Sequence, residues 1–249
     1  WYNDLLDCQP EKDFMVNNWI NNIQNLFFPG FCLVCGRKAT GGRDLCSRCA
    51  AGLAHNHTPC RCCALPLPET SQPGSCCGEC QNHQRPYDKV TAPYLYEGEI
   101  RHLHRAFKFH RKLSAGRLLS DLLCDAIEAR GETTVQLLIP VPLHPSRVRQ
   151  RGFNQAMEIA RIASGRFGIP VDQSCIRRTA ATAPQSGLTK RERIENIRGA
   201  FAMKRPVKAE QVAIIDDVMT TGMTIEQVAR VLRLHGVRRI DAWVVARRP

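Results

Sequence analysis

The chain is poor in aromatic residues, which make up 6% of its 249 residues, and has no apolar run close to the ~20 residues of a membrane-spanning helix. It lacks both common glycine-rich nucleotide loops, G-x-x-x-x-G-K-[ST] and G-x-G-x-x-G, so neither a P-loop nucleotide hydrolase nor a Rossmann dehydrogenase is indicated. No basic stretch followed by an apolar segment opens the sequence, so no secretory signal is expected. These absences predict a cytoplasmic protein.

The charge balance is strongly basic, with a formal net charge of +12, and 43% of the residues are apolar. That apolar share is enough for one ordinary α/β core, and the positive charge favours anionic partners such as phosphorylated sugars or nucleic acid. One basic cluster has the spacing of a helix and consists of Arg101, Arg105, Lys108, Arg111 and Lys112. For any single one of these charges, a solvated surface position is the simpler interpretation.

Residues 212–224 carry the most informative pattern, V-A-I-I-D-D-V-M-T-T-G-M-T. An apolar run predicts a buried strand, Asp216 and Asp217 follow it, and a loop rich in hydroxyl groups surrounds Gly222. Apolar residues at helical spacing then extend over residues 225–232. A strand that enters a helix in this way directs backbone N–H groups toward the helix N-terminus, where they and the helix dipole favour a phosphate.

The acid pair makes this pattern more specific than a phosphate-binding turn. Two carboxylates at the end of a strand can accept hydrogen bonds from neighbouring sugar hydroxyls, so the site is interpreted as one for ribose and phosphate together. The run resembles the phosphoribosyl-pyrophosphate (PRPP) loop of type I phosphoribosyltransferases. The resemblance implies that Asp216 and Asp217 hold the ribose hydroxyls. It assigns the 5-phosphate to Thr220, Thr221, Gly222, Met223 and Thr224. An ordinary strand-to-helix turn with a threonine cap is the alternative.

Eight of the thirteen cysteines form four C-x-x-C pairs, which are Cys32/Cys35, Cys46/Cys49, Cys60/Cys63 and Cys77/Cys80. Two such pairs supply four thiolates, which suit a structural Zn²⁺ with no open coordination position. Sequential pairing and a cross-braced arrangement both fit the spacing, and Cys62 and Cys76 can substitute for Cys63 or Cys77. Disulfides are the weaker interpretation, because no secretion signal is visible.

The remaining pattern predicts three parts, with an N-terminal extension and helix over residues 1–29, a zinc-binding module with two four-cysteine sites over 30–82 and an α/β domain over 83–249. Residues 100–130 are expected to be mostly helical, with Gly116 as the candidate break. An apolar run over residues 135–141 predicts a second parallel strand, and a helix is expected over 154–167.

Between these two elements, residues 142–152 form a basic loop, P-L-H-P-S-R-V-R-Q-R-G. In an open α/β sheet such loops gather at the C-terminal ends of the strands, where ligands bind. Cleavage of PRPP releases negatively charged pyrophosphate, which Mg²⁺ and basic side chains stabilise. The available cations include Arg147, Arg151, Lys190 and Arg191.

The order of the motifs is similar to that of the ComF/GntX family over residues 30–249. Two groups of four cysteines come first, then P-V-P-L-H-P-x-R-x-x-x-R-G-F-N-Q, then a block from Arg178 to Phe201, and then the PRPP loop. The resemblance implies a type I phosphoribosyltransferase-like parallel sheet with helices on both faces. It places Leu143 and His144 in a pyrophosphate loop and makes residues 178–198 a flexible loop that closes over PRPP. It also implies natural competence and the use of imported DNA.

Three functions stay open at this point. The first is phosphoribosyl transfer from PRPP to a base or a nucleic-acid-derived acceptor. The second is binding of single-stranded DNA by a competence factor whose PRPP site is not catalytic, with other competence proteins as partners. The basic helical row would contact phosphates, and Phe109 could stack on bases, while Phe107 is expected in the core. The third is purine salvage. The acceptor pocket has no sequence signature.

Overall fold

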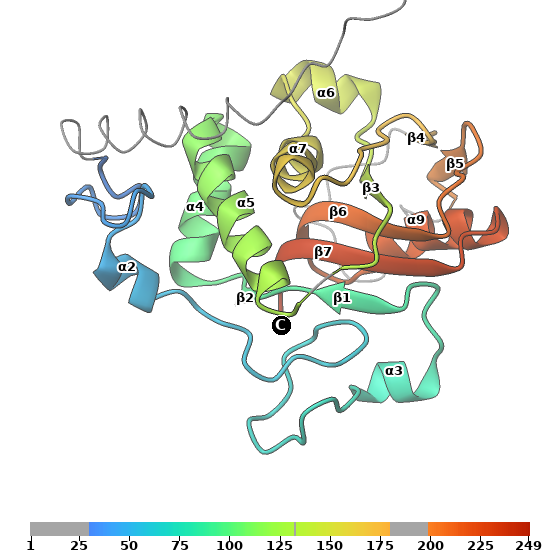
Figure 1. Cartoon of the computed structure of the whole chain (residues 1–249), viewed down its shortest axis with the longest axis horizontal. Helices are drawn as coiled ribbons and strands as arrows, with labels where there is room; N and C mark the ends of the chain where they lie inside the picture. Colours follow the sequence, from blue (N-terminus) through green and yellow to red (C-terminus); the bar gives the residue numbers. More distant parts are fainter. Residues whose placement is uncertain (1–29, 132, 180–198) are drawn as a thin grey trace, which may run out of the picture. The chain divides into compact units, whose positions relative to one another are not determined.

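The computed structural model describes residues 30–131, 133–179 and 199–249 (Figure 1). The chain divides into two compact units, with the division between Ala51 and Gly52. The first two C-x-x-C pairs belong to the first unit, and the last two pairs belong to the second unit together with the α/β sheet. The sequence instead predicts a boundary between residues 82 and 83, and the domain limits 30–82 and 83–249 stay a prediction.

The second unit is built on a five-stranded sheet in which every pairing is parallel. The strands follow the order β1-β7-β6-β3, and β2 also pairs with β7. Their bounds are β1, Lys89–Thr91; β2, Tyr94–Leu95; β3, Leu137–Pro140; β6, Gln211–Met219; and β7, Arg239–Arg247. The two long strands, β6 and β7, form the centre, with Ile215 opposite Trp243.

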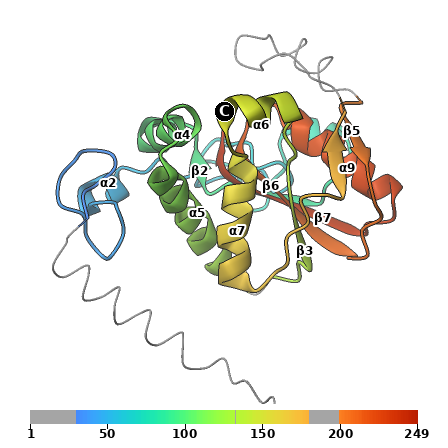
Figure 2. The same cartoon turned by 90° about the horizontal axis from the view of Figure 1, so that it is seen from above.

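The central strands are apolar because both faces of the sheet are covered. Residues 212–215 of β6 have no exposed surface, and neither do Ile240, Ala242, Val244 and Ala246 of β7. Continuous burial of this kind is typical of a parallel sheet between two layers of helices. In the second unit α5 (Leu113–Glu128) and α7 (Gln155–Phe167) cover one face, while α9 (Met223–Leu234) covers the other (Figure 2). The predicted fold class is confirmed.

The remaining elements are short or peripheral. They are α2 (Ser47–Ala51), α3 (Gly78–Asn82), α4 (Gly98–His110), α6 (Pro145–Arg151), and an antiparallel pair of β4 (Ile176–Arg178) and β5 (Phe201–Met203). Within the described residues, no helix combines the length and the apolar character needed to cross a bilayer.

The predicted helical region over residues 100–130 is divided, but Gly116 is not the break. The division falls at Arg111, which ends α4 in the left-handed conformation with φ 54°, and α5 starts at Leu113. Gly116 lies inside α5, where an added Cβ would come within 2.4 Å of a ring carbon of Phe107. The glycine is therefore required for the close packing of α4 on α5.

The segment around residues 142–167 is predicted correctly in part. The expected helix is α7, which follows Asn154, and the Asn154 side chain accepts a hydrogen bond of 3.1 Å from the Ala156 N–H. The expected basic loop, however, is largely the short helix α6. Pro145 favours the first position of a helix, and His144 at the N-cap accepts a hydrogen bond from the Ser146 N–H through its ring, so the two residues start this helix.

Candidate functional site

A cavity of about 290 Å³ lies where β3 and β6 end. Its walls come from segments far apart in the sequence, which are α4 with the nearby Tyr96, the segment from β3 to α7, and the segment from β6 to α9, together with Arg178 of β4 and Arg248 after β7. The lining residues used below are Tyr96, His104, Lys108, Phe109, Leu143, Arg147, Arg151, Asn154, Gln155, Arg178, Asp216, Asp217, Thr220, Thr221, Gly222, Met223 and Thr224.

Most of the residues that the sequence predicts for the PRPP site therefore share one cavity. The exception among the described residues is His144, which is not part of the wall and instead caps α6 through Ser146. Lys190 and Arg191 lie outside the described residues, as does the expected closing loop from residue 180 to residue 198.

Residues 220–224, which we call the hydroxyl-rich loop, form the entry to α9. Gly222 is the N-cap and has φ 82°, a left-handed conformation that other residues rarely adopt, and its carbonyl accepts the first helical bond from the Glu226 N–H. All five loop residues line the cavity. The N-terminus of α9, a helix of 12 residues, thus faces the cavity, and the N–H groups of its first turn and its dipole favour an anion there.

Asp217 is held by protein groups on both carboxylate oxygens. Its Oδ1 accepts a hydrogen bond of 2.7 Å from the Val218 N–H, and its Oδ2 lies 2.9 Å from Nε2 of His104 and 3.7 Å from Nζ of Lys108. The other ring nitrogen of His104 lies 3.0 Å from the hydroxyl of Tyr96. Burial alone would raise the pKa of Asp217, but Lys108 and His104 hold it well below its usual range.

Asp216 has the opposite electrostatic environment. Its Oδ1 accepts the Asp217 N–H at 2.9 Å, but among the described residues no cation forms a salt bridge with it. Removal from solvent, and then the neighbouring charge of Asp217, raise the pKa of Asp216. The pair is therefore asymmetric, with one carboxylate anchored as an anion and the other able to hold a proton.

The sequence did not indicate the contribution of α4 to this site. The sequence pattern does not single out Tyr96 or His104, and it assigns Lys108 to a row of nucleic-acid contacts. The sequence does contain a signal for His104, because this residue falls among Ile100, Leu103 and Phe107 on the apolar stripe of α4. In the structure His104 is only 4% exposed. A histidine on such a stripe needs a polar partner, which here is Asp217.

The segment from β3 to α7 contributes cations and amides. Burial lowers the pKa of Arg151, and it also lowers that of Arg178, which reaches the cavity from β4. Arg151 donates to Oε1 of Gln155 at 3.3 Å. Gln155 is 2% exposed, and its Nε2 has no hydrogen-bond partner among the described residues. This amide donor in the cavity wall is available to a ligand.

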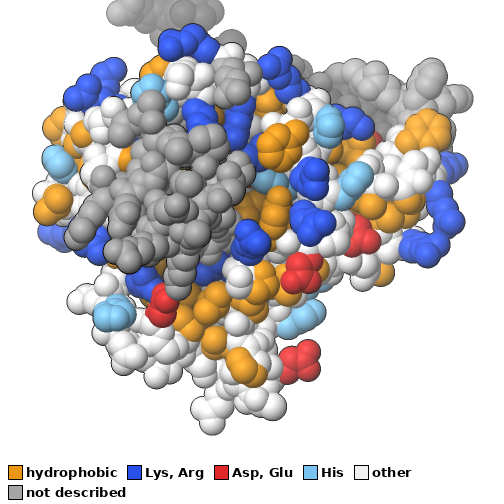
Figure 3. Space-filling model, turned by 180° about the vertical axis from the view of Figure 1, so that it is seen from behind, with side chains coloured by type: hydrophobic (Ala, Val, Ile, Leu, Met, Phe, Trp, Pro, Cys, Tyr) orange, Lys and Arg blue, Asp and Glu red, His pale blue; other side chains and the backbone are white. Residues whose placement is uncertain are grey.

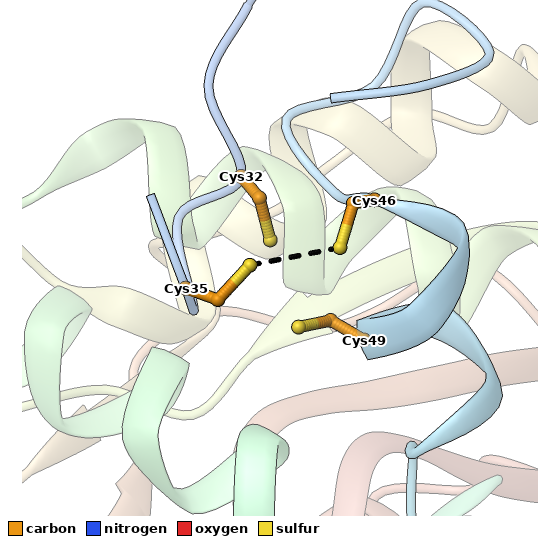
Figure 4. A group of neighbouring side chains, drawn as sticks. All are labelled: Cys32, Cys35, Cys46 and Cys49. Atoms are coloured by element: carbon orange, nitrogen blue, oxygen red, sulfur yellow. Dashed lines mark hydrogen bonds between the residues drawn. The ribbon is translucent and has the colours of Figure 1, made fainter. Parts of the chain in front are cut away.

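The four C-x-x-C pairs form two clusters of four sulfurs, and within each cluster all sulfurs lie within 4.8 Å of one another. The first cluster is Cys32, Cys35, Cys46 and Cys49, and the second is Cys60, Cys63, Cys77 and Cys80. In the first cluster the sulfurs of Cys32 and Cys35, of Cys46 just before α2 and of Cys49 within α2 point toward one another (Figure 4). The sulfurs of Cys35 and Cys46 lie 3.6 Å apart. The grouping is sequential rather than cross-braced, and Cys62 and Cys76 belong to neither cluster. Four converging thiols fit a tetrahedral Zn²⁺.

Comparison with known proteins agrees with this geometry. A double zinc ribbon domain matches residues 23–81, and a phosphoribosyl transferase domain matches residues 148–249. The class is thus a phosphoribosyltransferase-type α/β domain that carries a double zinc ribbon.

Full-length relatives give the family. The DNA utilization protein YhgH of Escherichia coli O157:H7 is 33% identical over 227 residues, covering 89% of this chain and 99% of the relative. Competence protein F of Haemophilus influenzae is 31% identical over 229 residues, covering 89% and 98%. The chain belongs to the ComF/GntX family. A purine phosphoribosyltransferase from Pyrococcus horikoshii superimposes with a TM-score of 0.31 and 16% identity over 52% of this chain and 70% of its own, which is too distant to add to this conclusion.

Proposed function

We propose that the chain binds PRPP in the cavity at the end of β6 and transfers its phosphoribosyl group. The observation that carries the proposal is that the acid pair, the hydroxyl-rich loop and two arginines, Arg147 and Arg151, line a single cavity. The loop and the N-terminus of α9 would hold the 5-phosphate, and Asp216 and Asp217 would accept hydrogen bonds from the ribose hydroxyls. Arg147 and Arg151, with Lys190 and Arg191 from the segment outside the described residues, would neutralise the diphosphate.

The residues also fit a Mg²⁺ ion that enters with PRPP. Mg²⁺ in such sites is held by one or two carboxylates together with substrate phosphate oxygens, and Asp216 and Asp217 provide carboxylates beside an anion site. When bound, the ion would add positive charge near the departing pyrophosphate. Asp217 is already kept anionic by His104 and Lys108, so one metal-binding carboxylate is charged before the ligand arrives.

We propose only the chemical class of the acceptor, which is a base or a group derived from nucleic acid. Gln155 supplies an amide donor in the cavity wall that suits hydrogen bonding to such an acceptor or to the sugar. Purine salvage is one form of this reaction. A cytoplasmic location stays a prediction from the sequence, and contacts with other competence proteins stay a prediction from the family resemblance.

Calorimetric titration with PRPP and Mg²⁺ tests the assignment. Each hydrogen bond between a charged group and a ligand contributes roughly 1.5–3 kcal/mol, so the double variant Asp216→Asn/Asp217→Asn should lose affinity by about tenfold or more. Asp241→Asn is the matched control, because Asp241 is a largely buried carboxylate of β7 that does not line the cavity. An unchanged affinity of the double variant for PRPP would refute the assignment of the cavity as the PRPP site. A screen for pyrophosphate release with free bases and with single-stranded DNA then identifies the acceptor class.

A second function, binding of single-stranded nucleic acid, is favoured by the surface of α4. Arg101 and Arg105 are exposed there, and Phe109, which lines the cavity, is 61% exposed. Phe107 is 1% exposed and is a core residue, as expected. Lysine and arginine side chains also predominate over acidic ones on the face shown in Figure 3. Exposed cations that follow a phosphate backbone, with an aromatic ring for stacking, are typical of single-strand binding.

Fluorescence anisotropy with labelled oligonucleotides at several salt concentrations tests this second function. Phosphate contacts release counterions, so affinity should fall steeply as salt rises. Arg101→Glu/Arg105→Glu should weaken binding strongly, whereas Lys204→Glu/Lys208→Glu, which changes the net charge equally at exposed positions elsewhere, should weaken it little. Equal losses of oligonucleotide affinity in the two variants would indicate only a general charge effect. If no oligonucleotide binds at low salt, phosphoribosyl transfer is the only one of the two functions that stands.

A further inference from the structure

Arg247, at the end of β7, is a buried arginine whose guanidinium joins the second cysteine cluster to the cavity. It is 6% exposed. Its Nε donates to the carbonyl of Cys63 at 3.2 Å, and its Nη1 donates to the carbonyl of Met219 at 3.1 Å and to that of Thr220. Cys63 belongs to the second cluster, while Met219 and Thr220 lead into the hydroxyl-rich loop. The side chain of Arg247 thus contacts both sites, and its partner in the cysteine cluster, Cys63, lies 184 residues earlier in the chain.

A second connection runs between the same two parts. Arg85 donates to Glu79 at 2.7 Å and to Glu226 at 3.1 Å. Glu79 lies in α3, between the two ligands of the last C-x-x-C pair, and Glu226 lies in the first turn of α9. The side chain of Arg85 is 15% exposed and that of Glu226 is 10% exposed, so solvent screens this pair only weakly.

Packing supports these polar connections. Cys60, Cys63 and Cys77 belong to the same buried cluster as Met219 and Ile225, the residues that flank the hydroxyl-rich loop. The second cysteine cluster is therefore part of the core that positions this loop. The first cluster lies in the other compact unit and has its own backbone turns.

We propose that Arg247 is a positioning residue that links the second cysteine cluster to the anion site, so that zinc at one and a sugar phosphate at the other stabilise each other. The inference rests on the proposed function of the cavity. Without metal, four thiols no longer share an ion, and the turn that carries the Cys63 carbonyl loses its main constraint. Arg247 then loses one of its partners, and the carbonyls of Met219 and Thr220 lose the donor that fixes the start of the loop.

Linkage of this kind is reciprocal, which provides a measurement independent of enzymatic activity. If zinc at the second cluster strengthens anion binding, a bound anion must hold that zinc more tightly by the same factor. The expected factor is about fivefold or more, the lower range of typical coupling between sites. The effect should be confined to one of the two zinc ions, because only the second cluster contacts Arg247 among the described residues.

The experiment measures zinc release from the full chain to a chelating dye, with and without saturating ribose 5-phosphate. This ligand keeps the sugar and the 5-phosphate of PRPP but lacks the diphosphate, which would itself chelate zinc. At equilibrium with the dye, one zinc ion should have a dissociation constant about fivefold lower in its presence, and the other should be unaffected. Cys35→Ser, which weakens the first cluster only, should retain the protected ion.

Arg247→Met should abolish the protection. Arg233→Met is the matched control, since Arg233 also donates to backbone carbonyls, those of Pro86 and Val237, but has no hydrogen bond to the second cluster or to the hydroxyl-rich loop within the described part of the chain. The control should keep the protection. If Arg247→Met does not fold, Arg247→Lys serves instead, because a lysine keeps the charge but cannot span the same carbonyls, and it should reduce the protection.

Calorimetry on the same samples separates the possible failures. If ribose 5-phosphate binds to the wild type and neither zinc ion is protected, the linkage is wrong while the proposed function stands. If zinc is protected equally in wild type and in the Arg247 variants, the role of Arg247 is wrong. If neither ribose 5-phosphate nor PRPP binds, the proposed function fails and the linkage fails with it.

Discussion

Replacing Asp216 by asparagine should stabilise the ligand-free protein at alkaline pH while it weakens PRPP binding. Burial and the charge of Asp217 raise the pKa of Asp216 in the folded state. A carboxyl group with a raised folded pKa contributes stability that is fully present below its unfolded pKa, about 3.9, and is lost as pH rises through the folded value. The loss has a limiting slope of about 1.4 kcal/mol per pH unit. Asparagine does not ionise and can still accept the Asp217 N–H, so the variant avoids this loss.

Asp217→Asn is the matched control, because the same substitution one residue away should have the opposite effect. Lys108 and His104 hold the pKa of Asp217 low, so its contribution is present above the unfolded pKa and is lost only as pH falls through the folded value. At neutral pH the substitution removes a charged acceptor from His104 and a neighbour from Lys108. A destabilisation of roughly 1.5–3 kcal/mol is expected for one such charged hydrogen bond.

The assay is urea unfolding of the zinc-loaded protein, followed by circular dichroism between about pH 6 and about pH 9. The midpoint of Asp216→Asn should rise relative to wild type as pH increases, with an unchanged slope against urea, and that of Asp217→Asn should fall below wild type throughout. PRPP affinity, measured in parallel, should fall in both variants. If Asp216→Asn is less stable than wild type at every pH, or if both variants shift in the same direction, the electrostatic asymmetry of the pair is refuted.

Two further predictions concern metal content and packing. Protein purified without added metal should contain about two zinc ions per chain, one for each cysteine cluster, and a metal-free but fully folded protein would contradict this. Gly116→Ala should destabilise the fold, because the clash with Phe107 costs about 1–3 kcal/mol, whereas Gly165→Ala, inside α7 with no atom within 4 Å, should stabilise it by up to about 1 kcal/mol. Urea unfolding of both variants checks the difference, and equal midpoints would show that α5 moves to accept the methyl group.

The parts of the site that could be predicted from the sequence are those in which a local pattern determines local structure. The strand, acid pair, loop and helix over residues 211–234 follow one another in the chain, and each has its own signature in apolar spacing, charge or glycine. The same holds for β3 and α7. The sulfurs of each C-x-x-C pair are likewise brought together by a single turn, so the cysteine clusters could be expected before their grouping was known.

The parts that could not be predicted depend on contacts between distant segments. His104 meets Asp217 across 113 residues, and nothing in the periodicity of α4 specifies which strand end its buried histidine will face. Gly116 has the composition of a helix break, but the ring of Phe107 from the neighbouring helix requires it. In the basic loop, capping by His144 and Pro145 outweighs the expectation of an irregular segment. In each case tertiary packing or capping decides between alternatives that the local sequence leaves open.

The position of β7 in the middle of the sheet has a consequence for the order of folding during synthesis. The strands β1 and β2 have no strand partner other than β7 within the described residues, and the Ile240 N–H reaches Asp88 across 152 residues. Most of the chain must therefore leave the ribosome before the first strands can pair, and contacts of such long range form slowly. Until then the second cysteine cluster lacks Arg247, and the open edges of the sheet are available to other chains. A nascent chain that stalls before β7 is complete therefore has unpaired strand edges and a second cysteine cluster without its contact to Arg247.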